Sequence, residues 1–124
     1  MNKQRPIHLA LHRIKLPPSG IVSILHRISG LILFFALPLL LLMLQYSLRS
    51  IETYTQLMNV LAHPIIKLML IGLLWAFLHH FFAGLRYLAI DVHFLSSLAQ
   101  SRASSKLVLF VSLILTILIG AQLW

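Results

Sequence analysis

The sequence contains no cysteine and only two acidic side chains, Glu52 and Asp91, in 124 residues. Without cysteine the chain offers no disulfide, no thiolate ligand for an iron–sulfur cluster and no thiol nucleophile. Any redox chemistry must therefore be carried by a bound cofactor. Both acids lie near the ends of apolar runs, so ion or drug transport through a carboxylate in mid-membrane is poorly supported.

Charge is scarce and apolar side chains are abundant. Hydrophobic residues make up 60% of the chain and charged residues 10%, and the mean hydropathy is +0.95. A soluble domain of this size cannot bury that much apolar surface, which indicates a membrane protein. The net charge of +8 would suggest nucleic acid in a soluble domain. Here the basic residues flank apolar runs, so we expect contacts with lipid headgroups or a cofactor and no nucleic-acid partner.

Three apolar segments are long enough to cross about 30 Å of hydrocarbon as helices. We expect spans at about 20–48, 64–91 and 104–124, in one all-α, three-helix membrane domain that covers residues 1–124. Pro38 predicts a kink in the first span, and Pro64 suits the first turn of the second because its missing N–H does no harm there. The basic segment 1–19 lacks an apolar core before a cleavage site, so we expect a retained arm.

The distribution of Lys and Arg predicts the orientation. Four basic residues lie in the arm, Arg102 and Lys106 lie between the second and third spans, and Arg49 is the single Arg between the first two. By the positive-inside rule the N-terminus is cytoplasmic and the C-terminus faces outward. A retained arm favours a bacterial inner membrane, although a chain encoded in an organelle would look the same.

Small residues recur every four positions in the third span, at Ser112, Thr116 and Gly120. Such a ridge lets another helix approach closely. We therefore expect a packing face there and assign no chemistry to it.

His80 lies inside the second span, where an imidazole is costly to bury without a partner. Helical spacing places it on one stripe with Ala76, Phe77, Ala83, Gly84, Tyr87 and Asp91. This face is partly cleared of bulk, so a flat ligand such as haem could lie against it. The competing interpretations are a hydrogen-bonded structural histidine and a proton relay. A relay needs carboxylates in mid-membrane, which the chain lacks, and the small neighbours favour a ligand to haem iron.

A second polar group occurs in the first two turns of the first span, where Ser23, His26 and Arg27 share one face. A guanidinium there can hold a haem propionate or lie beside a quinone, and a hydroxyl can donate to a quinone carbonyl. The alternative is that Arg27 anchors lipid headgroups and Ser23 caps or packs the helix.

The other histidines are poorly placed to share an iron with His80. His79 is about 100° round the helix and is expected to face a neighbouring helix or lipid. His63 is about 25 Å away along the axis. His26 is the single candidate within the chain for a second axial ligand, and another subunit is the favoured source.

These residues fall in three sequence segments that resemble one family. The segments are QRP in the arm, SILHRISG in the first span and HHFFAGLRYLAID in the second. They resemble the cytochrome b membrane-anchor subunit of succinate dehydrogenase, or complex II. The resemblance covers nearly the whole chain and includes the three-span plan.

The resemblance implies particular residue roles. In that family the histidine four residues before the glycine ligates haem b, which places this role on His80 beside Gly84. The opposite ligand comes from a second anchor subunit. The quinone-site serine and arginine correspond to Ser23 and Arg27, and His26 and Arg27 would lie near the haem propionates.

The resemblance also implies partners. A flavoprotein subunit would oxidise succinate, an iron–sulfur subunit would carry the electrons, and the two anchors would deliver them to ubiquinone in the membrane. The position after Arg86 is often histidine in the family and is Tyr87 here, so its role is open. Alternatives are the anchor of a fumarate reductase, which runs the same chemistry in reverse, and a haem-free structural anchor, which would leave His80 unexplained.

Overall fold

The computed structural model describes residues 15–95 and 97–123, and all regular structure in these residues is helical. Three of the helices are long and apolar enough to cross a membrane. This confirms the predicted all-α membrane bundle with three spans. Pro38 lies inside the first helix, which continues through it. The four helices are α1 (Pro18–Ser47), α2 (Ile51–Leu61), α3 (Pro64–Asp91) and α4 (Leu98–Leu123).

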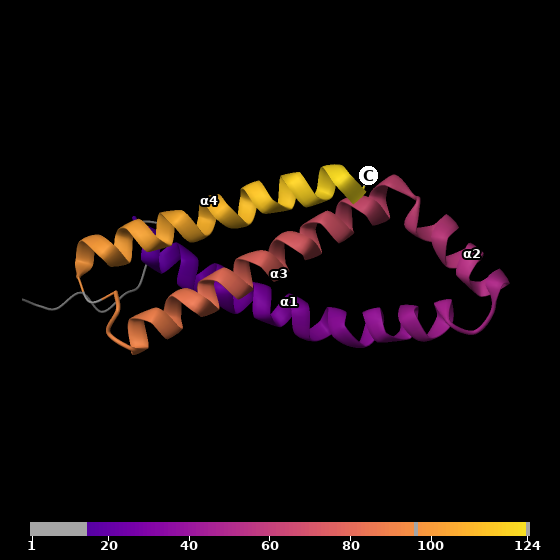
Figure 1. The fold of residues 1–124 in the computed structure, drawn as a ribbon, viewed down its shortest axis with the longest axis horizontal. Helices are drawn as coiled ribbons and strands as arrows, with labels where there is room; N and C mark the ends of the chain where they lie inside the picture. The colour runs from indigo at the N-terminus through magenta and orange to yellow at the C-terminus, as the bar shows by residue number, and fades with distance from the viewer. Residues whose placement is uncertain (1–14, 96, 124) are drawn as a thin grey trace, which may run out of the picture.

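The long helices form an antiparallel arrangement in which α3 packs against both α1 and α4 (Figure 1). The beginnings of α1 and α4 and the end of α3 lie at one end of the bundle, and α2 lies at the other. The first of these ends carries the basic side chains Lys15, Arg27, Arg86, Arg102 and Lys106 in the described residues. We refer to it as the basic end.

Proline begins two of the spans. Pro18 and Pro64 occupy the first turns of α1 and α3, where the N–H that proline lacks would have no partner within the helix. At the start of α3 the Nδ1 atom of His63 also accepts a hydrogen bond from the Ile65 amide at 3.3 Å. His63 is therefore a helix cap rather than part of a metal site.

Two features of the fold differ from the sequence prediction. Helix α2 was not predicted; it begins with a capping box in which Ser50 and Thr53 each bond the other's backbone amide at 3.1 Å. Helix α4 begins at Leu98, ahead of the predicted span, because Ser97 and Gln100 cap it by the same pair of reciprocal bonds, each 3.1 Å long. Hydropathy predicts which part of a helix lies in the hydrocarbon of the membrane. The capping residues determine where the helix itself begins.

The small-residue ridge of α4 is a packing face, as predicted. Ser112, Thr116 and Gly120 are buried, and so is Ser105 one turn nearer the basic end. Each hydroxyl donates to a carbonyl of its own helix, such as Thr116 to Ser112 at 2.7 Å. The ridge thus brings α4 close to α3 without leaving unpaired polar groups in the membrane.

Few large side chains are buried inside this chain. The core is a small cluster of Val22, Ala83 and Val108 from the three long helices. In contrast, large apolar side chains such as Phe34 and Phe35 on α1 are 71% and 62% exposed. That much exposed apolar surface suits contact with lipid and with other membrane subunits.

The turn after α3 returns the chain to α4 through a Schellman motif. His93 has φ 60°, and the amides of His93 and Phe94 bond the carbonyls of Ile90 and Ala89 at 2.9 Å each. A side chain in this left-handed conformation costs about 1 kcal/mol relative to glycine. The motif folds Phe94 back over Ala89 at the basic end.

Candidate functional site

The imidazoles of His26 and His80 meet where α1 crosses α3. Their ring centroids are 4.2 Å apart and their planes differ by 9°, so the rings stack face to face. Both side chains are partly exposed. The structure thus brings together the two polar groups that the sequence marks on separate spans.

The two helices cross closely because each histidine packs over a glycine of the other helix. On both helices the histidine precedes a glycine by four residues, and the helices are antiparallel, so His80 faces Gly30 and His26 faces Gly84. A Cβ atom added at Gly30 would lie 2.9 Å from Cε1 of His80, whereas one at Gly84 would lie 3.8 Å from Nε2 of His26. An added Cβ at Gly30 would thus force the His80 ring to move, whereas one at Gly84 would make an ordinary van der Waals contact with His26. The H-x-x-x-G spacing occurs on both helices, but it does not by itself set the register that pairs them.

The hydrogen bonds of His80 fix which ring nitrogen carries the proton. Nδ1 lies 3.1 Å from the carbonyl oxygen of His26 and 3.4 Å from Oγ of Ser29, and that hydroxyl itself donates to the His26 carbonyl at 3.0 Å. A carbonyl only accepts, so Nδ1 of His80 must be protonated. Nε2 then keeps a lone pair, and it makes no hydrogen bond within the described residues.

A histidine in this state is suited to bind a metal, because ligating imidazoles normally donate their other N–H to a carbonyl or carboxylate. Ser29 is 1% exposed and was not singled out from the sequence, where only its spacing from His26 marks it. The stacked rings lie side by side rather than end to end. His26 is thus not placed to be the opposite ligand of an iron bound by His80.

Space for a ligand lies beside the pair rather than along the whole predicted stripe. Ala83 is fully buried in the core, so there the small residue packs the bundle itself, and the expectation of an open face was wrong for it. An apolar groove of about 770 Å³ instead opens between α1 and α3, beginning at Leu31 and Ala76 next to the histidine pair and extending away from the basic end. Its volume lies in the range of cofactor sites.

Ser23 and Arg27 lie on α1 beside His26. Ser23 is partly exposed and Arg27 is exposed, and neither side chain makes a hydrogen bond within the described part of the chain. Both are therefore available to a ligand or partner at the basic end. Their predicted roles at a quinone and a propionate stay predictions.

His79 faces into the bundle, in agreement with the expectation that it turns toward a neighbouring helix. It is fully buried, and its ring stacks on Trp75 at 5.3 Å between centroids. The backbone of Val22 is near the ring, at a geometry that falls short of a hydrogen bond, and neither ring nitrogen is bonded. His79 is thus a packed core residue one position away from His80.

Tyr87 packs on the other side of His26, with ring centroids 5.2 Å apart and planes tilted by 58°. Its hydroxyl is buried and has no hydrogen-bond partner. The ring therefore supports the histidine pair from the basic end.

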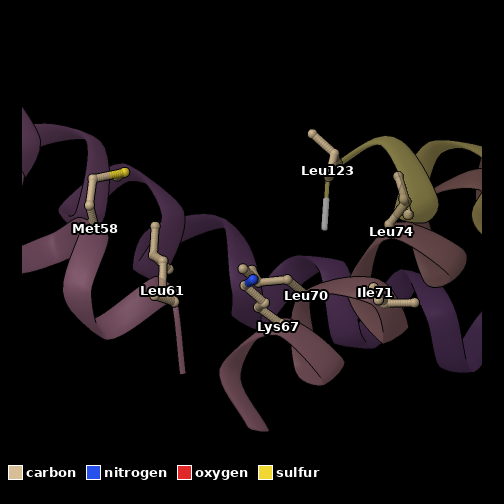
Figure 2. Close-up of a pocket in the computed structure, with 9 residues that line it drawn as sticks. Met58, Leu61, Lys67, Leu70, Ile71, Leu74 and Leu123 are labelled. Atoms are coloured by element: carbon tan, nitrogen blue, oxygen red, sulfur yellow. The ribbon is translucent and has the colours of Figure 1, made fainter. Parts of the chain in front are cut away.

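Another pocket, of about 490 Å³, lies at the opposite end of the bundle (Figure 2). It contains none of the predicted site residues. Figure 2 shows apolar side chains around it together with Lys67. Its labelled lining residues are Met58, Leu61, Lys67, Leu70, Ile71, Leu74 and Leu123.

Comparison with known proteins places the chain in a family. Residues 1–119 match the family described as Succinate dehydrogenase/Fumarate reductase transmembrane subunit. The succinate dehydrogenase cytochrome b556 subunit of Coxiella burnetii is 41% identical over the full length of both chains. The protein of the same name from Rickettsia felis is 30% identical over 90% of this chain and 86% of its own length. With its three apolar helices, this chain is a multi-pass protein of the bacterial inner membrane, and it belongs to the family of succinate dehydrogenase/fumarate reductase transmembrane subunits.

Proposed function

We propose that this chain is the cytochrome b anchor of a succinate dehydrogenase, with His80 as an axial ligand of haem b. The single observation that carries the proposal is the state of His80. Its Nδ1–H points to the His26 carbonyl at 3.1 Å, which leaves the Nε2 lone pair for iron. The related chains from Coxiella burnetii and Rickettsia felis are named as cytochrome b556 subunits.

The opposite iron ligand is proposed to come from a second anchor subunit. His26 stacks beside His80 rather than facing it, so it is not placed to bind the opposite side of an iron held by His80. One protein ligand from each of two subunits would complete the axial pair. The exposed apolar surface of α1 supplies area for such a partner.

A bound haem supplies a one-electron carrier within the membrane. The residues of this chain would hold and orient it. The His26 carbonyl and Ser29 would fix the orientation of His80. Gly84 has no side chain and would leave room for the haem on the adjacent surface of α3. The imidazole of His26 and the guanidinium of Arg27 are proposed to bind the propionates.

Ser23 and Arg27 are proposed to form this chain's part of the ubiquinone site at the basic end. A serine hydroxyl donates to a quinone carbonyl, and an adjacent guanidinium stabilises the negative charge that develops on that oxygen during reduction. Protons must reach the reduced quinone from water, so a site at the end of the bundle suits this chemistry. The basic end is proposed to face the cytoplasm, where flavoprotein and iron–sulfur subunits would dock.

Replacing His80 with leucine should abolish or change the b-type haem absorption of the assembled complex, because leucine has no lone pair to give to iron. The control is His79→Leu, which removes the neighbouring, inward-facing imidazole and should keep the spectrum. Reduced-minus-oxidised difference spectra of the purified complex measure both. An unaltered spectrum in the His80 variant would refute the ligand assignment.

Gly30→Ala should displace the His80 ring, because the new methyl group would lie 2.9 Å from Cε1. Overpacking of this kind costs about 1–3 kcal/mol, so we expect a lower thermal unfolding temperature and less haem per complex. Gly72→Ala on α3 is the matched control, since no atom lies within 4 Å of its added Cβ. Equal haem content in the two variants would show that the crossing does not hold the ligand.

Ser23→Ala and Arg27→Leu should lower the rate of quinone reduction about tenfold each, the effect of losing a hydrogen bond of about 1.4 kcal/mol in the transition state. Succinate oxidation with an artificial acceptor should change little. Ser47→Ala, which removes an exposed hydroxyl at the far end of α1, is the control. Equal loss of both activities would point to failed assembly and would not support a quinone role.

A further inference from the structure

Arg86 is a buried cation on the side of α3 away from His80. Its side chain is 5% exposed. Nε donates to Oγ of Ser104 at 3.1 Å, and Nη2 donates to the carbonyl and hydroxyl of Ser101 at 3.2 and 2.9 Å. All of these acceptors are neutral oxygens of α4. The guanidinium thus ties α3 to α4 while its charge stays uncompensated within these bonds.

The sequence supplies almost no counter-charge. Its two acidic side chains are Glu52 on α2, at the far end of the bundle, and Asp91 at the end of α3, and neither bonds Arg86. Burying a cation without a compensating anion is expensive. An anionic group from outside the chain would remove that cost.

The Nη1 atom of Arg86 is the part of the guanidinium left for such an anion. It donates no hydrogen bond within the described residues. The ring of Tyr87, with its centroid 5.3 Å from the guanidinium carbon, stabilises the charge but accepts no hydrogen bond from it. A phosphate oxygen is a strong acceptor for these two N–H groups, and arginine pairs with phosphate in a charge-assisted geometry.

An apolar groove of about 360 Å³ runs beside this cation between α3 and α4, and Arg86 and Ser104 are its charged and hydroxyl-bearing lining residues. Farther from the basic end the groove is lined by Phe82, Leu85 and Val111. The side chains of Leu85 and Leu107 at the groove are 48% and 60% exposed. The groove therefore joins a buried cation near the basic end to an apolar surface deeper in the bundle.

We infer that this groove, the Arg86 groove, binds an anionic phospholipid, with the phosphate at Nη1 of Arg86 and an acyl chain along Phe82, Leu85 and Val111. A carboxylate from a partner subunit would neutralise the cation but would not fill the apolar groove beside it. The site is separate from the histidine pair, since His80 faces α1 and Arg86 faces α4.

The test measures lipid retention by the intact complex that copurifies with this chain. Delipidated complex is incubated with equal amounts of phosphatidylglycerol and phosphatidylcholine of the same acyl chains, and bound lipid is counted by native mass spectrometry. We expect the wild type to retain phosphatidylglycerol about tenfold more than phosphatidylcholine. Arg86→Gln should remove most of this preference. Arg102→Gln, which removes an equal but exposed charge, should keep it.

A second variant tests the groove independently, in case Arg86→Gln does not fold. Val111→Trp fills the apolar part of the groove and leaves Arg86 and its serine partners unchanged, so it should lower phosphatidylglycerol retention while the thermal unfolding temperature stays near that of the wild type. Equal retention of the two lipids by the wild type would overturn the inference. So would Arg86 and Arg102 variants that behave alike, or an Arg86→Gln complex that keeps its lipid preference but loses a partner subunit.

Discussion

The close approach of α1 to α3 at Gly30 is the contact on which the histidine site depends. A helix normally keeps its neighbour at the distance set by side chains, yet here Cε1 of His80 lies only 2.9 Å from the position that a Cβ atom on Gly30 would take. That approach brings the His26 carbonyl within hydrogen-bonding distance of Nδ1 of His80. The proton position, and with it the free lone pair on Nε2, follows from this one piece of packing.

The two interfaces of α3 use different chemistry for the same purpose. Within a membrane, burial of apolar surface does not drive helices together, so small residues and hydrogen bonds must do so. Toward α1 the contact consists of glycines and stacked imidazoles. Toward α4 it consists of a ridge of serine, threonine and glycine and of the Arg86 bonds to Ser101 and Ser104. One face is thereby arranged around the hydrogen-bonded His80 imidazole and the other around a buried charge.

The sequence predicted the spans well because the hydrocarbon thickness imposes a length and a composition on each of them. His26 and His80 were also identified, because an imidazole in an apolar helix is costly to bury unless it has a partner. Their stacking was not predicted, because it depends on the register between α1 and α3, which no single-helix pattern encodes. Helix α2 and the early start of α4 were missed since their signals are the caps at Ser50 and Ser97 rather than hydropathy. The partners of Arg86 lie 15 and 18 residues away, across a turn whose path the sequence did not reveal.

The central claim is that the crossing of α1 and α3 holds His80 with Nδ1 on the His26 carbonyl and Nε2 free to bind iron. A high-resolution electron cryomicroscopy map of the complete membrane complex tests it most directly. The account predicts a haem whose iron lies at bonding distance from Nε2, with Nδ1 still on that carbonyl. A map with no macrocycle at His80, or with Nδ1 turned away from α1, would contradict it.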